Sequence, residues 1–386
     1  MWIGACTSTV GTWMQTVAQS WLVYTLSKDN PFYLGLDGFL GQIPIMLFSL
    51  IGGVIADRSD RRTVLLGSQY VQMSCAFLLA TLAYFHVVQV WHILCLSFTV
   101  GMAQSFGGPA YSALIPSLVP KDDLPNAIAL NSIQFNLARI IGPVLGGVAL
   151  AKLGADWCFG LNGISFVAVI VTLYVIKVGF IPAKSSGAVL ASMKEGIAFI
   201  RVQEGMKPLI VLSFLMTMLG IPLITFLPVF AKEVLHGGTS TFTQLLYCSG
   251  GGSVCGALMV AGLGRTKGQG LRALLMLVLL GVVTIVFARS TSLALSSTMM
   301  FFGGAAMITV FATISSLVKA ITEDSMRGRV MSVYNVAFRG GMPIGMLVVG
   351  RLIPSYTAPV TMSFVGVLTI LLGLYFLLVQ RRIARL

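Results

Sequence analysis

The stretch GGVIADRSDRRTVL, Gly52–Leu65, decides the fold of this chain. An apolar run ends at Ala56, a dense cluster of charges follows, and apolar residues resume at Val64. Because a charge at bilayer depth is costly, a charged hinge between two long apolar segments is expected at a membrane surface. The charged residues of the cluster are Asp57, Arg58, Asp60, Arg61 and Arg62.

Composition supports a membrane protein with several spans. The chain has 386 residues, of which 56% are hydrophobic and only 10% are charged, whereas soluble domains carry roughly 25% charged residues. The net charge of +13 is typical of cytoplasmic loops in such a protein and predicts no nucleic-acid partner. No phosphate-binding loop and no metal-ligand spacing occur, so we expect no ATP, metal or other cofactor.

Twelve segments have the apolar length that a transmembrane helix needs, about 20 residues. Most Lys and Arg residues lie on alternate connections, which predicts that both termini are cytoplasmic. The predicted spans are 2–26, 32–56, 63–85, 91–115, 126–151, 157–178, 208–231, 241–263, 271–288, 292–318, 329–352 and 357–380.

The longest connection and an internal repeat divide the chain. Residues 179–207 are rich in Lys, Ser and Gly, and apolar residues there recur at helical spacing, which predicts a surface amphipathic helix or a structured linker. SIQFNLARIIGP, Ser132–Pro143, is echoed by SVYNVAFRGGMP, Ser332–Pro343. We therefore predict an N-terminal bundle over 1–178, a cytoplasmic linker over 179–207 and a C-terminal bundle over 208–386.

The charged loop resembles the signature G-x-x-x-D-R-x-G-R-R/K between helices 2 and 3 of the major facilitator superfamily. Asp60 stands where that family usually has glycine, which predicts a less tight turn. Gly11–Tyr24 and Pro109–Ser132 resemble the bacterial drug-efflux and enterobactin-exporter-like branch. The resemblance implies twelve helices in two six-helix bundles related as parallel repeats, with the substrate site between them. The matching loop residues are Gly53, Asp57, Arg58, Arg61 and Arg62.

A second motif lies in the fifth predicted span and resembles the antiporter motif G-P-x-x-G-G. In the family this element is associated with exchange in the export direction. Proline bends a helix and glycine permits close helix contact, so packing alone is the alternative explanation. The matching residues are Gly142, Pro143, Gly146 and Gly147.

Arg139 and Arg339 are predicted at bilayer depth, where a charge must be paired or hydrated. One hypothesis is that both line a central cavity and contact a polar or anionic substrate. The alternative is that each fixes helix packing within its own half. Further candidates for lining the cavity are Asn136, Asn335, Gln15 and Gln19.

Asp37 is the only acidic residue predicted within a span, so it is the first candidate for proton coupling. Coupling requires a carboxylate that loads and unloads protons near neutral pH. By family resemblance, Asp57 is expected to pair with the cytoplasmic end of helix 11 and to act as a conformational latch. Helix 4 lacks the arginine that related antiporters often carry, so coupling remains a hypothesis.

These features favour a secondary active transporter in the bacterial plasma (inner) membrane. We expect proton-coupled efflux of small amphipathic molecules, such as drugs or siderophore-like compounds, with the lipid bilayer and protons as partners. The alternatives are an importer or lipid translocator on the same fold, or a non-transporting sensor or scaffold. An enzyme is not expected, because the histidines are scattered and no nucleophile–base constellation occurs.

Overall fold

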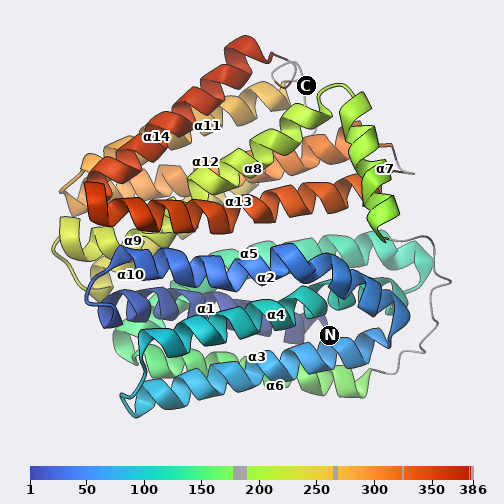
Figure 1. Ribbon diagram of the computed structural model, residues 1–386, viewed down its shortest axis with the longest axis horizontal. Coiled ribbons are helices and arrows are strands. Elements are labelled where there is room, and N and C mark those ends of the chain that lie inside the picture. Colours follow the sequence, from blue (N-terminus) through green and yellow to red (C-terminus); the bar gives the residue numbers. More distant parts are fainter. Residues whose placement is uncertain (177–188, 264–267, 324–325, 382, 384–386) are drawn as a thin grey trace. The chain divides into compact units, whose positions relative to one another are not determined.

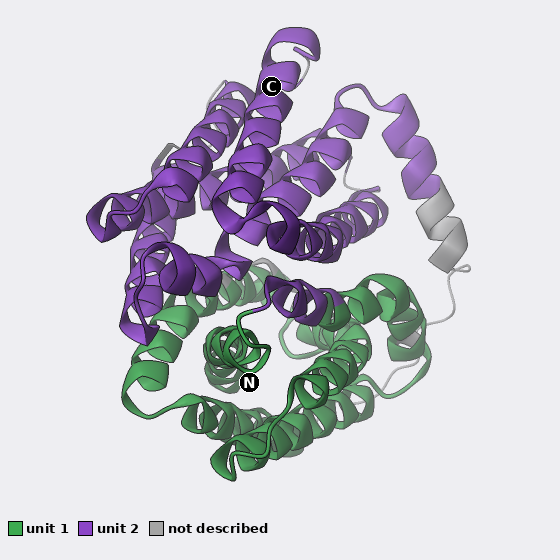
Figure 2. Ribbon diagram, turned by 60° about the vertical axis from the view of Figure 1, so that its left-hand side comes forward, with its two compact units in different colours: residues 1–29, 40–188 green, residues 30–39, 189–386 purple. Residues whose placement is uncertain are grey.

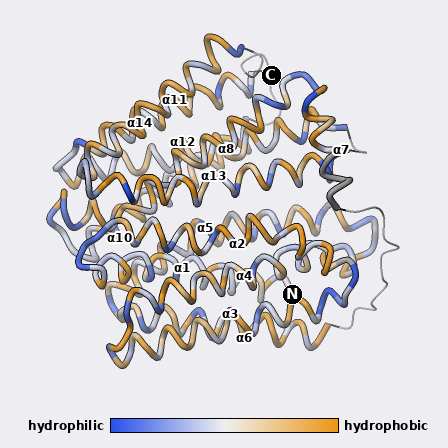
Figure 3. Tube along the Cα trace, in the orientation of Figure 1, coloured by the Kyte–Doolittle hydropathy of each residue, from blue (hydrophilic) through white to orange (hydrophobic). Residues whose placement is uncertain are grey.

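The computed structural model of the chain describes residues 1–176, 189–263, 268–323, 326–381 and 383. Every regular element among these residues is helical (Figure 1). Hydrophobic residues run along the helices, and hydrophilic residues gather towards the helix ends (Figure 3). Helices satisfy their own backbone hydrogen bonds, which the interior of a bilayer requires.

Among the described residues, 11 helices are long and apolar enough to cross a membrane. The helix α1 (Trp2–Leu26) is 25 residues long but is not one of them. Its glutamines, Gln15 and Gln19, and its many Ser and Thr residues lower its mean hydropathy. The sequence predicts that this helix is also a span, which would bring the total to twelve. Helix length and mean hydropathy alone do not identify it as one.

The chain divides into two units, coloured separately in Figure 2. Unit 1 comprises residues 1–29 and 40–188, of which residues 177–188 lie outside the described part. Within unit 1, α1 packs on α5 and α6, and α3 packs on α4 and α6. The remaining elements up to residue 176 are α2 (Pro31–Arg58), α3 (Arg61–Tyr84), α4 (Val90–Leu114), η1 (Ile115–Ser117), η2 (Lys121–Asp123), α5 (Leu124–Lys152) and α6 (Ala155–Val175).

Unit 2 comprises residues 30–39, the start of α2, together with residues 189–386. Within unit 2, α8 packs on α13 and α14, and α11 packs on α12 and α14. Its elements after residue 188 are α7 (Val189–Val202), α8 (Met206–Thr225), α9 (Leu227–Val229), η3 (Phe230–Val234), α10 (Thr239–Leu263), α11 (Gln269–Arg289), α12 (Leu293–Ile321), α13 (Arg327–Tyr356), α14 (Ala358–Leu374) and η4 (Tyr375–Val379).

The same helix pairings recur in the two units. The pair α1–α5 in unit 1 corresponds to α8–α13 in unit 2, and α3–α4 corresponds to α11–α12. Likewise, α3–α6 corresponds to α11–α14. The helices therefore pack in the same pattern within each unit, as expected for a chain with repeated sequence segments.

The helix α7 lies in the predicted connection and is held against α13 within unit 2. Glu195 of α7 forms an ion pair with Arg329, with 2.6 Å between Oε2 and Nη1. A methyl group at Gly196 would lie 2.9 Å from the carbonyl oxygen of Arg329, so the two helices are in close contact. The preceding residues 179–188 of the predicted linker lie outside the described residues.

Candidate functional site

The charged loop between α2 and α3 consists of only Ser59 and Asp60. Asp60 is the N-cap of α3, and its carboxylate accepts hydrogen bonds from the backbone N–H of Arg62 at 3.1 Å and from Oγ1 of Thr63 at 2.6 Å. A carboxylate at this position satisfies a backbone donor that the helix leaves without a partner. Asp60, which stands where the family usually has glycine, therefore caps α3 and closes a short turn.

The two arginines that begin α3 contact the ends of two other helices in unit 1. Nη1 of Arg61 donates to the carbonyl oxygen of Ala113 in the last turn of α4, at 2.9 Å. Nη2 of Arg62 donates to the carbonyl oxygen of Tyr174 in the last turn of α6, at 3.0 Å. The last carbonyls of a helix have no partner within the helix, and they attract a positive charge. These arginines therefore fasten α3 to both helices.

The remaining residues of the loop signature contribute differently. A Cβ atom at Gly53 would meet nothing within 4 Å, so its packing in this structure does not require glycine. Arg58, the last residue of α2, is exposed. The side chain of Asp57 lies outside the described part, so the expected latch contact stays a prediction.

The glycines of the antiporter-like motif bring α5 against α1. A methyl group at Gly146 would lie 2.8 Å from the Cα and 2.9 Å from the carbonyl oxygen of Met14. A methyl group at Gly142 would collide with the Cβ of Trp13. Pro143 lies inside α5, and Gly147 is buried. The motif is therefore a close helix contact of the small-xxx-small kind.

Unit 2 contains a corresponding contact that the sequence analysis missed. A methyl group at Gly341 of α13 would collide with the carbonyl oxygen of Phe214 in α8, and one at Gly345 with that of Met218. These glycines are four residues apart on α13, beside Pro343. The small-xxx-small spacing was the signal that could have revealed them.

A polar network connects α6, α1 and α4 within unit 1. Asn162 of α6 donates from Nδ2 to Oε1 of Gln15 at 2.6 Å, and Nε2 of Gln19 donates to Oγ of Ser97 at 2.9 Å. Gln15 and Gln19 are linked to each other by a hydrogen bond of 3.4 Å. Both glutamines were candidates from the sequence, but Asn162 was not. An amide residue within the apolar run of α6 was the pattern that could have indicated it.

Buried Gln134 of α5 makes a second polar contact with α1. Its Nε2 donates to Oγ1 of Thr9 at 2.7 Å and to the carbonyl oxygen of Ala5 at 3.2 Å. Amide side chains inside a membrane bundle lower their free energy by such bonds between helices. Three polar side chains of α1, those of Thr9, Gln15 and Gln19, therefore face other helices of unit 1.

The two arginines predicted at bilayer depth, Arg139 in α5 and Arg339 in α13, lie in helices that are long and apolar enough to span a membrane, and both are partly buried. In the part of the chain that the structure describes, the Arg339 guanidinium makes no hydrogen bond or ion pair with the protein. Asn335, one turn before Arg339, is exposed. The side chain of Asn136 lies outside the described part.

Asp37 lies near the start of α2, in the segment that belongs to unit 2. It is flanked by two glycines that approach α13: a methyl at Gly35 would collide with the carbonyl oxygen of Met346, and one at Gly38 with the sulfur of the same residue. Asp37 itself is partly buried. Among the described residues, no group of three or more His, Cys, Asp and Glu side chains could hold a metal ion.

The family described as "Transmembrane secretion effector" matches residues 1–384, which is nearly the whole chain. The chain belongs to this family of the major facilitator superfamily. The family and its relatives are transporters and not enzymes. This family member is accordingly a multi-pass membrane transporter.

Three relatives place the chain in an efflux and siderophore-transport branch. The staphyloferrin A transporter of Staphylococcus aureus is 27% identical, over 97% of this chain and 94% of the relative. A multidrug efflux pump of Mycolicibacterium fortuitum is 24% identical, over 96% and 92%. Macrolide efflux protein A of Streptococcus pyogenes is 19% identical, and here the match spans 65% of this chain and 63% of the relative.

Solved transporter structures share the fold. A nucleoside transporter has a TM-score of 0.73 at 13% identity and covers 97% of both chains. A peptide transporter in complex with sulfate has a TM-score of 0.76 at 15% identity and covers 100% of this chain and 94% of its own. At such low identity these likenesses concern the fold alone.

Proposed function

We propose that the protein is a secondary active exporter of small amphipathic molecules that works by alternating access. The proposal includes twelve helices in two six-helix repeats, over 1–178 and 208–386, joined by a cytoplasmic linker over 179–207. It also places the protein in the bacterial inner membrane with both termini cytoplasmic. The efflux relatives, the recurring helix pairings and the asymmetric distribution of Lys and Arg support this proposal.

The guanidinium of Arg339, which has no hydrogen-bond or ion-pair partner in the described part of the chain, is the observation that carries the proposal. A charged residue within a spanning helix is costly unless it is paired or hydrated, and such residues commonly mark substrate pathways. Arg339 has no protein partner among the described residues, so its charge is free to receive a polar or anionic group of a substrate. Arg139 occupies the equivalent position of the first repeat and is proposed to act on the same substrate.

An aromatic cluster, two of whose rings lie on the same helix as Arg339 and within two turns of it, supports the proposal of an amphipathic substrate. Phe338 precedes Arg339 and contacts Phe311 edge to face, with 5.1 Å between ring centroids. Phe338 also stacks on Tyr334, at 5.9 Å. A charge beside aromatic surface suits a molecule that has both an anionic group and apolar rings. The staphyloferrin A transporter and the macrolide efflux protein, by their names, act on different compounds, so the test uses a panel that covers both classes.

The direct test is accumulation of a compound panel in efflux-deficient bacteria. The panel contains dyes, macrolides and catecholate siderophores, with and without a protonophore. We expect lower accumulation in cells with the wild-type protein, and loss of this effect in Arg339→Gln, with partial recovery in Arg339→Lys. Arg351→Gln is the matched control, because Arg351 lies on the same helix but is exposed. Full activity of a well-folded Arg339→Gln protein would refute the role of this charge.

Proton coupling and the latch need separate variants. Asp37→Asn is expected to remove the dependence of transport on a pH gradient, because the amide cannot load a proton. Unchanged pH dependence would exclude Asp37 as the coupling residue. Asp57→Asn is expected to impair transport while insertion remains normal, because the latch would lose its negative charge. Wild-type turnover of Asp57→Asn would count against the latch.

A further inference from the structure

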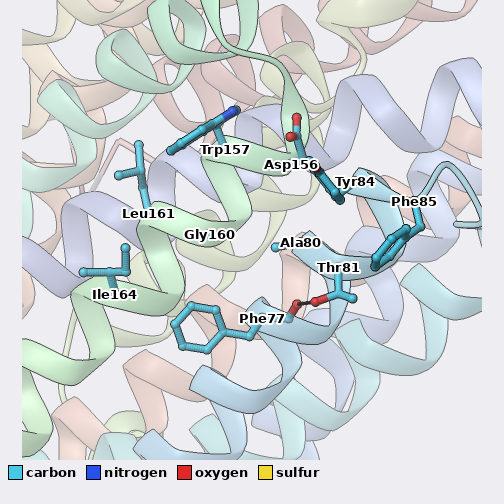
Figure 4. Close-up of a pocket in the computed structure, with 10 residues that line it drawn as sticks. All are labelled: Phe77, Ala80, Thr81, Tyr84, Phe85, Asp156, Trp157, Gly160, Leu161 and Ile164. Atoms are coloured by element: carbon cyan, nitrogen blue, oxygen red, sulfur yellow. Dashed lines mark hydrogen bonds between the residues drawn. The ribbon is translucent and has the colours of Figure 1, made fainter.

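The ends of α3 and α6 in unit 1 line an open surface pocket that the proposed transport function does not use. Its volume is about 290 Å³. Figure 4 shows side chains from the last turns of α3 facing side chains from the first turns of α6. Both helices are candidate membrane spans. The C-terminal end of α3 lies beside the N-terminal end of α6, so the pocket is at one end of both spans.

One end of the pocket combines aromatic rings with a carboxylate. Asp156 and Trp157 of α6 lie there with Tyr84, the last residue of α3, and Phe85, its C-cap (Figure 4). Within the described residues, no hydrogen bond or ion pair engages the carboxylate of Asp156. Trp and Tyr are enriched where a membrane meets water, so this end has the composition of the headgroup region.

The Asp156 carboxylate has a simple structural explanation as well. It lies in the first turn of α6, where a negative charge is favourable beside the helix N-terminus. That effect accounts for an acidic residue but not for the three aromatic side chains around it. A carboxylate together with the faces of Trp and Tyr is the arrangement that binds an organic ammonium group.

The other end of the pocket is apolar and contains open space. Phe77, Leu161 and Ile164 line it and are exposed on the surface of the unit. Gly163 lets the Phe77 ring lie directly on α6, because a methyl group there would be 2.7 Å from the ring. At Gly160, by contrast, a Cβ atom would meet nothing within 4 Å, so this glycine opens the pocket wall.

We propose that this pocket binds a bilayer phospholipid with an ammonium headgroup. Asp156, Trp157 and Tyr84 hold the ammonium group, and the apolar end accepts the upper part of an acyl chain. A soluble organic cation would make no use of the apolar end. An anionic lipid without an ammonium group would face the uncompensated charge of Asp156. The occupant is therefore a lipid whose own positive charge complements the pocket.

The test is native mass spectrometry of the purified full chain, titrated separately with phosphatidylethanolamine and phosphatidylglycerol of identical acyl chains. Tetramethylammonium, which has no acyl chain, provides the soluble cation. We expect the wild type to retain phosphatidylethanolamine preferentially. Asp156→Asn should reduce its retention by about fivefold, the scale of one partly exposed ion pair, and abolish the preference over phosphatidylglycerol.

Two pairs of variants control for folding. A Cβ atom at Gly160 meets nothing within 4 Å, so Gly160→Leu should extend into the pocket and displace the lipid. Gly67→Leu, at a position of α3 that is equally open to a Cβ atom, should not. Trp157→Leu should weaken retention of the lipid, whereas Trp91→Leu should not. Trp91 is the matched control because it lies outside the pocket and its exposed fraction, 58%, nearly equals the 57% of Trp157. The proposal is overturned if both lipids bind equally, if Gly160→Leu retains the lipid, or if only the soluble cation binds.

Discussion

Arg61 donates a hydrogen bond from Nη1 to the carbonyl oxygen of Ala113, 2.9 Å away in the last turn of α4. The two residues are far apart in sequence, and the bond joins the start of one spanning helix to the end of another. In family terms Arg61 belongs to a loop signature associated with conformational change. Its contact in this structure lies within unit 1, so a structural role accompanies any dynamic role.

Arg61→Gln is expected to destabilise unit 1, because a charged donor to a helix C-terminal carbonyl is lost. Hydrogen bonds to charged groups typically contribute about 1.5–3 kcal/mol, and a loss in that range should appear in detergent-driven unfolding. Arg58→Gln is the control, since Arg58 is exposed. Equal unfolding curves for Arg61→Gln and the wild type would show that this bond contributes nothing to stability.

Asp60→Ala should lower stability by about 1 kcal/mol, the usual effect of removing an N-cap acceptor. Asp60→Asn should retain most of the stability, because the amide oxygen can still accept the bond from the Arg62 backbone. The measurement is the free energy of unfolding of both variants in mixed micelles. If the two variants are equally destabilised, the effect of Asp60 comes from its charge and not from the cap.

Gly146→Leu should separate α1 from α5, because its Cβ would meet backbone atoms of Met14 that cannot rotate away. Overpacking typically costs about 1–3 kcal/mol, and more where backbone must move. We expect poor yields of folded protein, measured by size-exclusion chromatography of a fluorescent fusion. Gly67→Ala should give normal yields, since a Cβ there meets nothing within 4 Å. Normal yields of Gly146→Leu would disprove the close contact.

The bond between Asn162 and Gln15 can be measured by a double-mutant cycle. We expect Asn162→Ala and Gln15→Ala to be coupled by about 0.6–1.7 kcal/mol, the range for hydrogen bonds between membrane helices. Gln15→Ala combined with Thr81→Ala is the control and should be additive, because Thr81 bonds only the backbone of its own helix in the described structure. Additivity of the first pair would contradict a direct interaction.

The sequence predicted the helices well because long apolar runs and their charged ends are local features. The predicted span 2–26 matches α1, and 241–263 lies within two residues of α10. The glycine motif at Gly142 and Gly146 also predicted a close helix contact, since the small-xxx-small spacing is visible in the sequence. The repeated segment pointed to related halves, and the recurring helix pairings agree with that expectation.

The sequence could not predict which side chains form hydrogen bonds with other helices. That Arg61 and Arg62 bind the ends of α4 and α6, and that Asn162 meets Gln15, depends on which helix faces are brought together. The N-cap formed by Asp60 was also missed, because a family consensus says nothing about a side chain that caps the next helix.

The sequence by itself determined that this chain is a helical membrane transporter, because apolar length and charge spacing are one-dimensional properties. Only the tertiary structure decided which polar side chains bind other parts of the protein, and that Arg339 has no such partner among the described residues. It also decided that α3 and α6 line an open pocket beside Asp156. A hydrogen bond or a cavity requires two surfaces at a defined distance, and the packing of whole helices sets that distance.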